Sequence, residues 1–370
     1  METREQHSTW VEIDLAAIEA NARRLAGVTR ASLMAVVKAN GYGHGAVETA
    51  KAAGRGGASW LGVARADEAL ELRQAGVGLP ILVLGPAPGG RLAELIANGV
   101  SLTVGDLDHI RAAAAAARAQ NAIAKVHLKL DTGMNRLGAP PEAAVELAQR
   151  LRHEAAIHFE GVFTHFARAD ETEGGPIARQ IERFEQALTA LSAAGFRPAL
   201  VHAANSGATL NWPETHYDMV RVGILLYGLQ TSLAVPLPSG LRPALQWKTQ
   251  LARVRTLPPG AGVSYGHDYV TQREERIGTI PVGYADGLRR VDGNQVLVNG
   301  ERVPVVGRVC MDLCMLQLDR VPRAGEGDEV VLIGPQGQHR ISAEEIAEEW
   351  GTINYEVTCG IGPRVPRIYV

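Results

Sequence analysis

The chain has 370 residues, 46% of them hydrophobic, and a formal net charge of -3 at pH 7. This length exceeds that of a usual single domain and predicts one large barrel with a smaller domain, or two medium domains. Because charges of both signs are spread along the chain, we expect neither nucleic acid nor an anionic membrane as partner, and a small molecule is the expected ligand.

The cysteines, Cys310, Cys314 and Cys359, are too few for a disulfide framework, and their spacing predicts no zinc or other metal site. The first seven residues are charged and contain no apolar core of a signal peptide. No later stretch of about 18 apolar residues occurs. We therefore expect a protein of the reducing cytoplasm that is neither exported nor inserted into a membrane.

Short apolar or β-branched runs alternate with helical patterns between residues 30 and 222. The helical segments include 106–120, which contains a run of alanines, and 177–194. Eight β-α units over roughly 200 residues predict a (β/α)8 TIM barrel, since a doubly wound sheet usually has fewer strands. The predicted strands are Leu33–Val37, Trp60–Val63, Ile81–Leu84, Leu102–Val104, Lys125–Leu130, Gly161–Thr164, Leu200–His202 and Met219–Val222.

The pattern changes after about residue 235, where prolines and glycines separate short apolar runs. Turn signals such as Asn299-Gly300 are typical of links between antiparallel strands. We therefore predict an α/β chain with a barrel over 12–236 and a second, mainly β-strand domain over 237–370, to which strand 8–14 is assigned. The strands predicted there are Leu245–Thr256, Arg276–Val282, Val296–Val298, Val303–Val306 and Glu329–Ile333.

One segment, Ala35–Gly45, places a lysine at the end of an apolar run and a glycine-rich turn directly after it. A desolvated lysine such as Lys38 is a usable nucleophile for a Schiff base, because burial disfavours its ammonium form. A buried amine beside a phosphate-sized loop therefore indicates pyridoxal phosphate chemistry. The alternative is a strand that ends in a solvated lysine before an ordinary turn.

Further polar residues fall at the carboxyl ends of the predicted strands, where barrel enzymes place their active sites. Each has a structural explanation when taken alone, but together on one face they predict an active site. These residues are Lys38, Lys129, Asp131, His165, His202, Asn205 and Arg221.

A phosphate site is expected in the loops after the seventh and eighth strands. Ser206 can offer a hydroxyl group there, and Gly223 allows close approach of the backbone. Ordinary helix capping by Ser206 is compatible with this role.

The chain resembles the alanine racemases, pyridoxal phosphate enzymes of fold type III, from Trp10 nearly to the C-terminus. Eight ordered motifs make an accidental match improbable. The motifs are Val36–Gly45, Lys129–Gly138, Gly161–Phe166, His202–Ser206, Arg221–Ile224, Val263–His267, Gly283–Gly287 and Gly307–Asp312.

The resemblance implies a two-base interconversion of L-alanine and D-alanine. Lys38 should carry the cofactor and move the α proton on one face, while Tyr265 acts on the other. Racemisation needs both, since a single base would mostly restore the starting enantiomer. Arg136 should attract the substrate carboxylate and supply a cationic neighbour to Tyr265.

The resemblance also implies the surroundings of the cofactor. Arg221 should face its pyridine nitrogen, with His202 orienting the arginine and His165 near the side of Tyr265. The lysine that matches Lys129 is often carbamylated in this family, and the alternative is an ordinary pair with Asp131. The remaining residues implied in cofactor binding are Tyr42, Asn205, Ser206, Gly223, Ile224 and Tyr355.

Four residues of the β-rich domain should reach the barrel of a second subunit, so the resemblance implies a homodimer with composite active sites. Tyr284 should narrow the entrance, and the backbone of Met311 should meet the substrate carboxylate. Tyr265 and Asp312 complete this group. By residue type alone, Met311 and Tyr284 are expected in the core.

Three alternatives differ in chemistry. A non-catalytic pyridoxal phosphate carrier resembles the barrel alone and lacks the second domain. A fold-type III decarboxylase should have a carboxylate in place of Arg221. A broad-specificity amino acid racemase is closer, although such enzymes are usually exported. We therefore expect an alanine racemase that supplies D-alanine for peptidoglycan of the cell wall, the last point by analogy.

Overall fold

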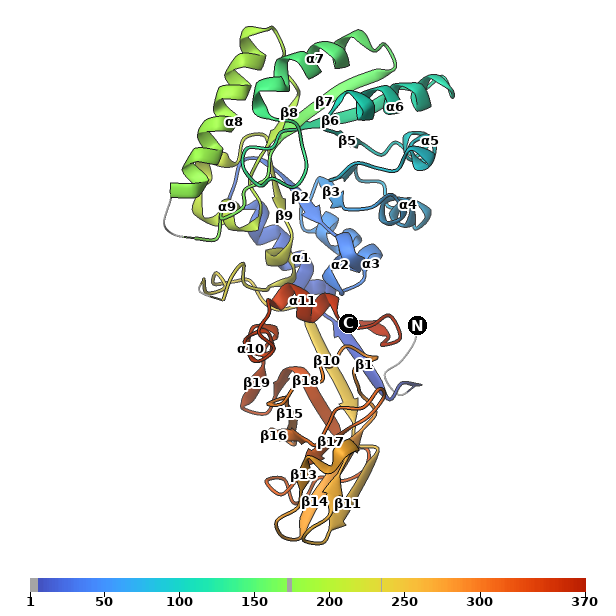
Figure 1. Cartoon of the computed structure of the whole chain (residues 1–370), viewed down its shortest axis with the longest axis vertical. Coiled ribbons are helices and arrows are strands. Elements are labelled where there is room, and N and C mark those ends of the chain that lie inside the picture. The colour runs from blue at the N-terminus through green and yellow to red at the C-terminus, as the bar shows by residue number, and fades with distance from the viewer. Residues whose placement is uncertain (1–5, 172–174, 234) are drawn as a thin grey trace. The chain divides into compact units, whose positions relative to one another are not determined.

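The computed structural model of the chain describes residues 6–171, 175–233 and 235–370 (Figure 1). Residues 1–5, which carry part of the N-terminal charge pattern, lie outside the described residues. The described residues form two compact units, one within 17–242 and one made of 6–16 with 243–370. We call them the barrel unit and the β-rich unit.

The described residues of the barrel unit contain eight parallel strands, in two four-stranded sheets with the orders β4-β3-β2-β9 and β5-β6-β7-β8. The bridge between Leu82 and Ser101 joins β4 to β5. On the other side, Asp218 N–H donates to Val201 O over 3.0 Å and joins β9 to β8. The strands are β2 (Ser32–Val36), β3 (Trp60–Val63), β4 (Ile81–Val83), β5 (Leu102–Val104), β6 (Ala124–Lys129), β7 (Ile157–Phe163), β8 (Leu200–His202) and β9 (Met219–Val222).

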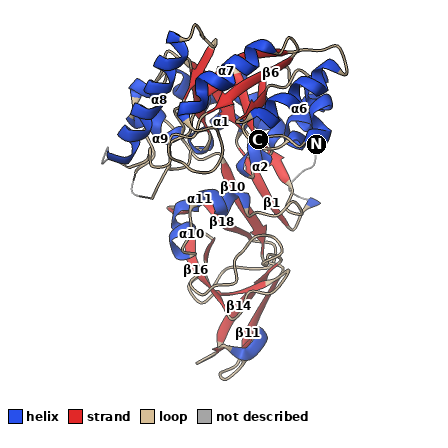
Figure 2. Cartoon of the chain, turned by 45° about the horizontal axis from the view of Figure 1, so that its top comes forward, coloured by secondary structure: helices blue, strands red, loops and turns tan. Residues whose placement is uncertain are grey.

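Helices follow the strands of this unit and flank them in Figure 2. In α6 the Asp106 side chain accepts a hydrogen bond from His109 N–H, and the alanines, which have the highest helix propensity, continue the helix. The helices are α1 (Leu15–Ala26), α2 (Lys38–Tyr42), α3 (Ala46–Arg55), α4 (Ala66–Gln74), α5 (Leu92–Ala97), α6 (Leu107–Arg118), α7 (Ala144–His153), α8 (Gly175–Ala193) and α9 (Ser206–Asn211), with short 3₁₀ turns at Gly89–Arg91, Pro141–Ala143, Pro213–Thr215 and Ile224–Tyr227.

All eight predicted barrel strands are present, so the predicted fold class is confirmed. The largest difference in their bounds is at β7, which begins at Ile157 instead of Gly161. Residues 157–160 are only partly buried or exposed, so they lack the continuous apolar run by which the other strands were recognised. Inside the unit, Met34, Leu82 and Met219 form a buried cluster.

Within its described part, the β-rich unit contains a ten-stranded sheet with the order β11-β14-β17-β16-β15-β18-β10-β1-β20, in which β19 pairs with β18. The N-terminal strand β1 pairs antiparallel with β10 and parallel with β20, and in Figure 1 the blue β1 lies beside the yellow β10. The strands are β1 (Thr9–Ile13), β10 (Leu245–Gln250), β11 (Arg253–Leu257), β14 (Glu275–Ile280), β15 (Gln295–Val298), β16 (Glu301–Val306), β17 (Cys314–Gln317), β18 (Glu329–Gln336), β19 (His339–Ile341) and β20 (Arg367–Tyr369).

The prediction of one strand over Leu245–Thr256 is wrong. The chain leaves β10 at Gln250 and begins β11 at Arg253, because the two segments pair with different strands, β1 and β18 for β10 and β14 for β11. The unit also contains the short hairpin β12 (Gly262–Val263) and β13 (Tyr269–Val270), a 3₁₀ turn at Tyr265–His267, and the helices α10 (Ala343–Glu349) and α11 (Asn354–Cys359).

Among the described helices, none combines the length and the hydropathy that a membrane span requires.

Candidate active site

Lys38 follows β2 and begins a turn of unusual backbone geometry. Ala39, Asn40 and Tyr42 have φ angles of 52°, 52° and 53°, in the left-handed region that non-glycine residues rarely adopt. The Asn40 side chain accepts a hydrogen bond from Ala46 N–H over 3.0 Å, which holds the turn against the start of α3. Such local strain is typical of functional sites, and here it turns the chain sharply after the candidate nucleophile.

Tyr42, Ser206 and Gly223 form a small buried polar cradle. The Ser206 hydroxyl accepts a hydrogen bond from Gly223 N–H over 3.0 Å. A Cβ atom added to Gly223 would lie only 2.4 Å from the Tyr42 hydroxyl group, so only glycine fits beside this tyrosine. Ile224 follows directly and is also buried. The cradle therefore presents hydroxyl groups and backbone at the end of β9.

Arg221, on β9, lies between two imidazole rings. Its Nη1 donates to Nδ1 of His202 over 2.9 Å, and its Nη2 lies 3.2 Å from Nδ1 of His165. Nη2 also donates to the carbonyl oxygens of Thr164 and Ala203, over 2.8 and 2.9 Å. Because a guanidinium group only donates, both Nδ1 atoms must accept, and the structure therefore brings together three of the predicted residues.

Burial determines the charges of this group. Desolvation lowers the pKa of Arg221 to about 9, which leaves the side chain cationic at neutral pH. Desolvation, followed by the charge of Arg221, also lowers the pKa of His165 and of His202 well below the usual value. Both imidazoles are therefore neutral, in agreement with their acceptor role toward Arg221.

Lys129, at the end of β6, is only 6% exposed. Its Nζ donates to Leu84 O over 3.3 Å and lies 5.2 Å from the centre of the Phe163 ring. Desolvation and then the charges of Arg221 and Arg136 lower its pKa to about 8. The structure does not place it in an ion pair with Asp131, so that alternative is wrong for this chain.

Asp131 instead shapes the loop that carries Arg136. One of its carboxylate oxygens accepts hydrogen bonds from Gly133 N–H and Asn135 N–H, both over 3.0 Å. Ala139 N–H donates to Lys129 O over 2.9 Å and closes the loop. Arg136 is exposed on this loop. A long cationic side chain held by a closed loop is suited to meet an anionic substrate.

Asn205, and not Ser206, caps α9. The Asn205 side chain accepts from Ala208 N–H over 3.0 Å and donates to Phe166 O over 3.2 Å. The capping explanation for Ser206 is therefore wrong, and its hydroxyl group is used in the cradle. Asn205 supports the loop after β8 by fixing its backbone.

The other predicted residues lie in loops of the β-rich unit that contact one another. Tyr284 N–H donates to Cys310 O and Ala285 N–H to Met311 O, both over 3.0 Å. A Cβ atom on Gly283 would lie 2.3 Å from these two carbonyl oxygens, so only glycine permits the approach. These contacts bring Tyr284 and Met311 together.

Tyr265 and Asp312 lie in the same group of loops. The Ser264 hydroxyl, next to Tyr265, donates to Arg308 O over 2.6 Å. The Asp312 carboxylate accepts from Arg364 over 2.7 Å. Tyr355 lies in α11 of this unit and is half-buried.

The side chains of this group are exposed, by 71% for Tyr265, 46% for Tyr284 and 54% for Met311. The expectation from residue type alone, which placed Tyr284 and Met311 in the core, is therefore wrong. Large exposed apolar side chains that cluster are typical of interaction surfaces.

Comparison with known proteins identifies the family. Residues 13–231 match the alanine racemase N-terminal domain, and residues 244–369 match the alanine racemase C-terminal domain. The chain belongs to the alanine racemase family. Members of this family are isomerases that racemise alanine, so the predicted family and enzyme class are confirmed.

Relatives of the alanine racemase family match over nearly their whole length. Alanine racemase of Desulfovibrio desulfuricans is 46% identical, with 98% of each chain covered. That of Symbiobacterium thermophilum is 48% identical, over 98% of this chain and 97% of the relative. Alanine racemase from Bacillus anthracis with bound L-Ala-P has a TM-score of 0.94 and 42% identity, over 98% of this chain and 95% of that chain.

Two polar residues of the barrel unit lie next to the candidate site but were not predicted from the sequence. His127, on β6, is fully buried and lies 2.9 Å from His202, and Glu160, on β7, lies 3.1 Å from His127. His127 is two residues before Lys129 on the strand and so shares its face, and this spacing from a predicted site residue is the signal that could have identified it. No comparable signal exists for Glu160, because the predicted strand began one residue later, at Gly161.

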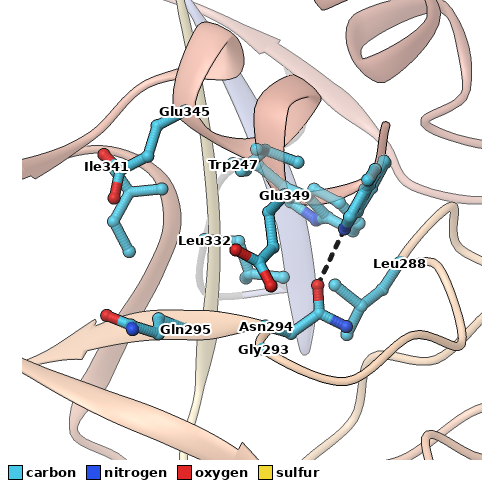
Figure 3. Close-up of a pocket in the computed structure, with 11 residues that line it drawn as sticks. Trp247, Leu288, Gly293, Asn294, Gln295, Leu332, Ile341, Glu345 and Glu349 are labelled. Carbon is cyan, nitrogen blue, oxygen red and sulfur yellow. Dashed lines mark hydrogen bonds between the residues drawn. The ribbon is translucent and has the colours of Figure 1, made fainter. Parts of the chain in front are cut away.

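A separate pocket of about 60 Å³ lies within the β-rich unit. Trp247 and Trp350 line it, and the Glu349 carboxylate lies over Gly293 (Figure 3). The Trp350 indole N–H donates to the Asn294 side chain over 2.8 Å. None of the predicted site residues lines this pocket, so it is not the candidate active site.

Proposed function

We propose that this chain interconverts L-alanine and D-alanine at a site built on Lys38, with pyridoxal phosphate as cofactor and Tyr265 as the second base. The observation that carries the proposal is the position of Arg221 between neutral imidazoles at the strand ends. An arginine facing a pyridine nitrogen donates a hydrogen bond without giving up its proton. Such a weak electron sink favours simple return of the α proton over cleavage of other bonds.

The barrel residues fit pyridoxal phosphate. Because Gly223 has no Cβ, the Tyr42 hydroxyl group can lie close to its backbone, and the Ser206 hydroxyl group accepts from Gly223 N–H at the same place. The charges that act on Lys129 come from three cations and one carboxylate, so the site attracts anions. Residues that would hold the cofactor are Lys38, Tyr42, His202, Asn205, Ser206, Arg221, Gly223, Ile224 and Tyr355.

The bound cofactor supplies the electron sink that makes the α proton of alanine removable. Lys38 Nζ takes or returns that proton on one face, and Tyr265 Oη does so on the other. Two groups on opposite faces are needed because a single base returns the proton to the face it came from. His165 Nε2 carries a proton, since its Nδ1 accepts from Arg221, and this N–H can donate toward the side of Tyr265.

Recognition of alanine rests on its carboxylate and its small side chain. Arg136 binds the carboxylate from the loop closed by Asp131, and the Met311 backbone is the second contact. Tyr284 and Asp312 shape the entrance and restrict it to a methyl group. A larger side chain would have to displace these groups, so we propose a preference for alanine over other amino acids.

We propose that two copies of the chain assemble as a homodimer, with Tyr265, Tyr284 and Met311 of one copy completing the barrel site of the other. The exposure of these three side chains supports the proposal. Tyr265 is 71% exposed in the single chain, so a second copy is needed to enclose it in a site from which water is excluded. A closed dimer with two-fold symmetry is the most common arrangement of such assemblies.

We also propose that the enzyme works in the cytoplasm and supplies D-alanine for a bacterial cell wall. Cys310 and Cys314 form no disulfide within the described part of the chain, which suits a reducing compartment. Expression in a bacterium that requires D-alanine for growth should remove that requirement, and continued dependence would contradict the proposal.

The mechanism is tested by incubating the cofactor-loaded enzyme with L-alanine in deuterium oxide. We expect D-alanine with deuterium at the α position. Tyr265→Phe should lower racemisation by at least about 100-fold, the usual contribution of a general acid or base, while one enantiomer still exchanges its α proton through Lys38. Chiral chromatography and proton NMR measure the two outcomes separately.

Tyr269→Phe is the matched control, since this tyrosine of the same unit donates to Glu275 and is not assigned to the site. It should racemise alanine at the native rate. Absence of D-alanine from the native enzyme would contradict the proposal and direct the assay to other amino acids. Equal losses in the two variants would remove Tyr265 from the mechanism.

A further inference from the structure

A line of buried polar side chains runs from Arg221 into the barrel. Arg221 Nη1 lies 2.9 Å from His202 Nδ1, and His202 Nε2 lies 2.9 Å from His127 Nδ1. His127 Nε2 lies 3.1 Å from a carboxylate oxygen of Glu160. Each ring thus uses both of its nitrogen atoms, and the line joins a guanidinium group to a carboxylate.

The two ends of this line, a guanidinium group that only donates and a carboxylate that only accepts, together set the direction of every hydrogen bond in it. Arginine only donates, so His202 Nδ1 accepts and the proton of this neutral ring is on Nε2. That N–H donates to His127 Nδ1, which places the proton of His127 on Nε2. The His127 N–H then donates to Glu160. A single pair of tautomers therefore satisfies all members.

The barrel is shaped around the two rings. The His202 ring stacks on Phe163, with ring centres 4.7 Å apart and planes 6° apart. The Trp60 and His127 rings form an edge-to-face contact, with ring centres 5.7 Å apart. A Cβ atom on Gly161 would lie 2.5 Å from His127 Nδ1, so glycine at this position makes room for the ring.

Glu160 is held as a carboxylate at the end of the line. Ser101 donates to the same oxygen over 2.5 Å, and Lys125 Nζ lies 4.0 Å from the other oxygen. Burial raises the pKa of Glu160, but the hydrogen bonds from His127 and Ser101 outweigh it and hold the pKa below its usual value. The charge of Glu160 is therefore present at neutral pH.

We propose that Glu160 and His127 are positioning residues for racemisation, which fix the tautomer of His202 so that its Nδ1 always accepts from Arg221. This inference rests on the proposed place of Arg221 at the cofactor nitrogen. Glu160 and His127 touch neither substrate nor cofactor in this scheme and act only through His202.

The reverse tautomers would break the contact with Arg221. If His127 carried its proton on Nδ1, His202 Nε2 would have to accept, and the proton of His202 would be on Nδ1. Two N–H groups would then face each other at Arg221. The Glu160 carboxylate prevents this, because it only accepts and so keeps the proton on His127 Nε2.

The first test is nitrogen-15 NMR of histidine-labelled enzyme, which distinguishes protonated from unprotonated ring nitrogens. We expect both His202 and His127 to carry the proton on Nε2 alone, with or without the cofactor. The opposite tautomer on either ring would overturn the proposal. This measurement does not depend on activity, so its result stands even if the enzyme does not racemise alanine.

The second test is Glu160→Gln, which keeps the size of the side chain but removes its charge and lets it donate as well as accept. We expect mixed tautomers of His127 and a fall in kcat of about tenfold, the lower range for loss of an orienting partner. KM for alanine should stay unchanged, because Arg136 is not touched.

Glu275→Gln is the matched control, since Glu275 is a carboxylate in the β-rich unit that is 3% exposed and accepts from Tyr269 and Gln317. It should change neither the histidine signals nor kcat. If Glu160→Gln does not fold, His127→Asn serves in its place. The asparagine oxygen can still accept from His202 near the position of His127 Nδ1, but the shorter side chain no longer donates a hydrogen bond to Glu160. Unchanged kcat in the folded variant, or an equal fall in Glu275→Gln, would overturn the positioning role.

Discussion

At the scale of single residues, Lys129 combines near-complete burial with the charges of Arg221, Arg136 and Lys38. Burial disfavours its ammonium form, and repulsion by these cations adds to that effect, so its pKa falls to about 8. A neutral lysine amine can add carbon dioxide, and the resulting carbamate would be an anion among cations. Lys129 would then hold Arg136 by attraction, which gives the carbamylation implied by the family resemblance a physical cause.

We therefore predict a carbamate on Lys129. Carbon-13 NMR of the enzyme in labelled bicarbonate should show a protein carbamate signal that grows, at fixed dissolved carbon dioxide, as the pH rises through about 8. Lys129→Arg keeps a positive charge but cannot form the carbamate, so the signal should be absent. A signal of equal intensity in that variant would assign the carbamate to another lysine.

The shifted pKa of Lys129 also predicts how stability depends on pH without bicarbonate. An unfolded lysine titrates near 10.4, so between about pH 8 and that value the unfolded chain binds more protons. The free energy of unfolding should therefore rise with pH across this window, by about 3 kcal/mol in total. Lys129→Met should lose this contribution and keep the rise from Arg221, whose pKa is also lowered. An identical pH profile in both proteins would contradict the prediction.

At the scale of elements, the close approach of β6 and β7 depends on one glycine. His127 is opposite Gly161 in the register of these strands, and the absent side chain leaves the space that the imidazole ring fills. A methyl group there would also lie 2.8 Å from Leu200 O on β8. Three neighbouring strands of the barrel are thus fitted around this position.

We predict that Gly161→Ala destabilises the barrel by about 1–3 kcal/mol, the usual cost of overpacking a close-packed interior. Calorimetry should register the loss as a lower midpoint of thermal unfolding. In the control variant Gly78→Ala, the new methyl group meets nothing within 4 Å, and the change should stay within about 0.5 kcal/mol. Similar midpoints for the two variants would mean that His127 and Leu200 move aside at little cost.

At the scale of the whole molecule, the proposed catalytic residues are divided between the two units. Lys38, Arg136 and Arg221 belong to the barrel unit, while Tyr265 and Met311 belong to the β-rich unit. The exposed Tyr265 needs an enclosing partner to act on a dehydrated substrate. The proposed dimer, which joins the barrel of one copy to the β-rich unit of the other, would supply that partner.

Mixing two inactive variants tests this composite site. In a heterodimer of Lys38→Ala and Tyr265→Phe, one site receives both defects and the other receives none. Random reassociation should therefore restore about a quarter of the native activity, because half of the dimers are mixed and each has one intact site. If both residues of a site came from one chain, every site would be defective and no activity would return.

Much of the fold was predictable because its signals are local. The apolar runs of β2, β3 and β5 and the alanine run of α6 specify strand and helix from a few neighbouring residues. The break between β10 and β11 was not predictable, because the strand-like sequence pattern continues from one segment into the next. The two segments differ only in the strands with which they pair.

The sequence by itself determined the barrel, the β-rich second domain and the alanine racemase family, because motifs and periodicity are properties of neighbouring positions. The residues of the candidate site stay a prediction. Only the tertiary structure decided that Ser206 bonds Gly223, that Lys129 has a lowered pKa and that His127 continues the line to Glu160. The physical reason is distance along the chain: His127 and His202 are 75 residues apart in sequence, and only the closed barrel places their rings 2.9 Å apart.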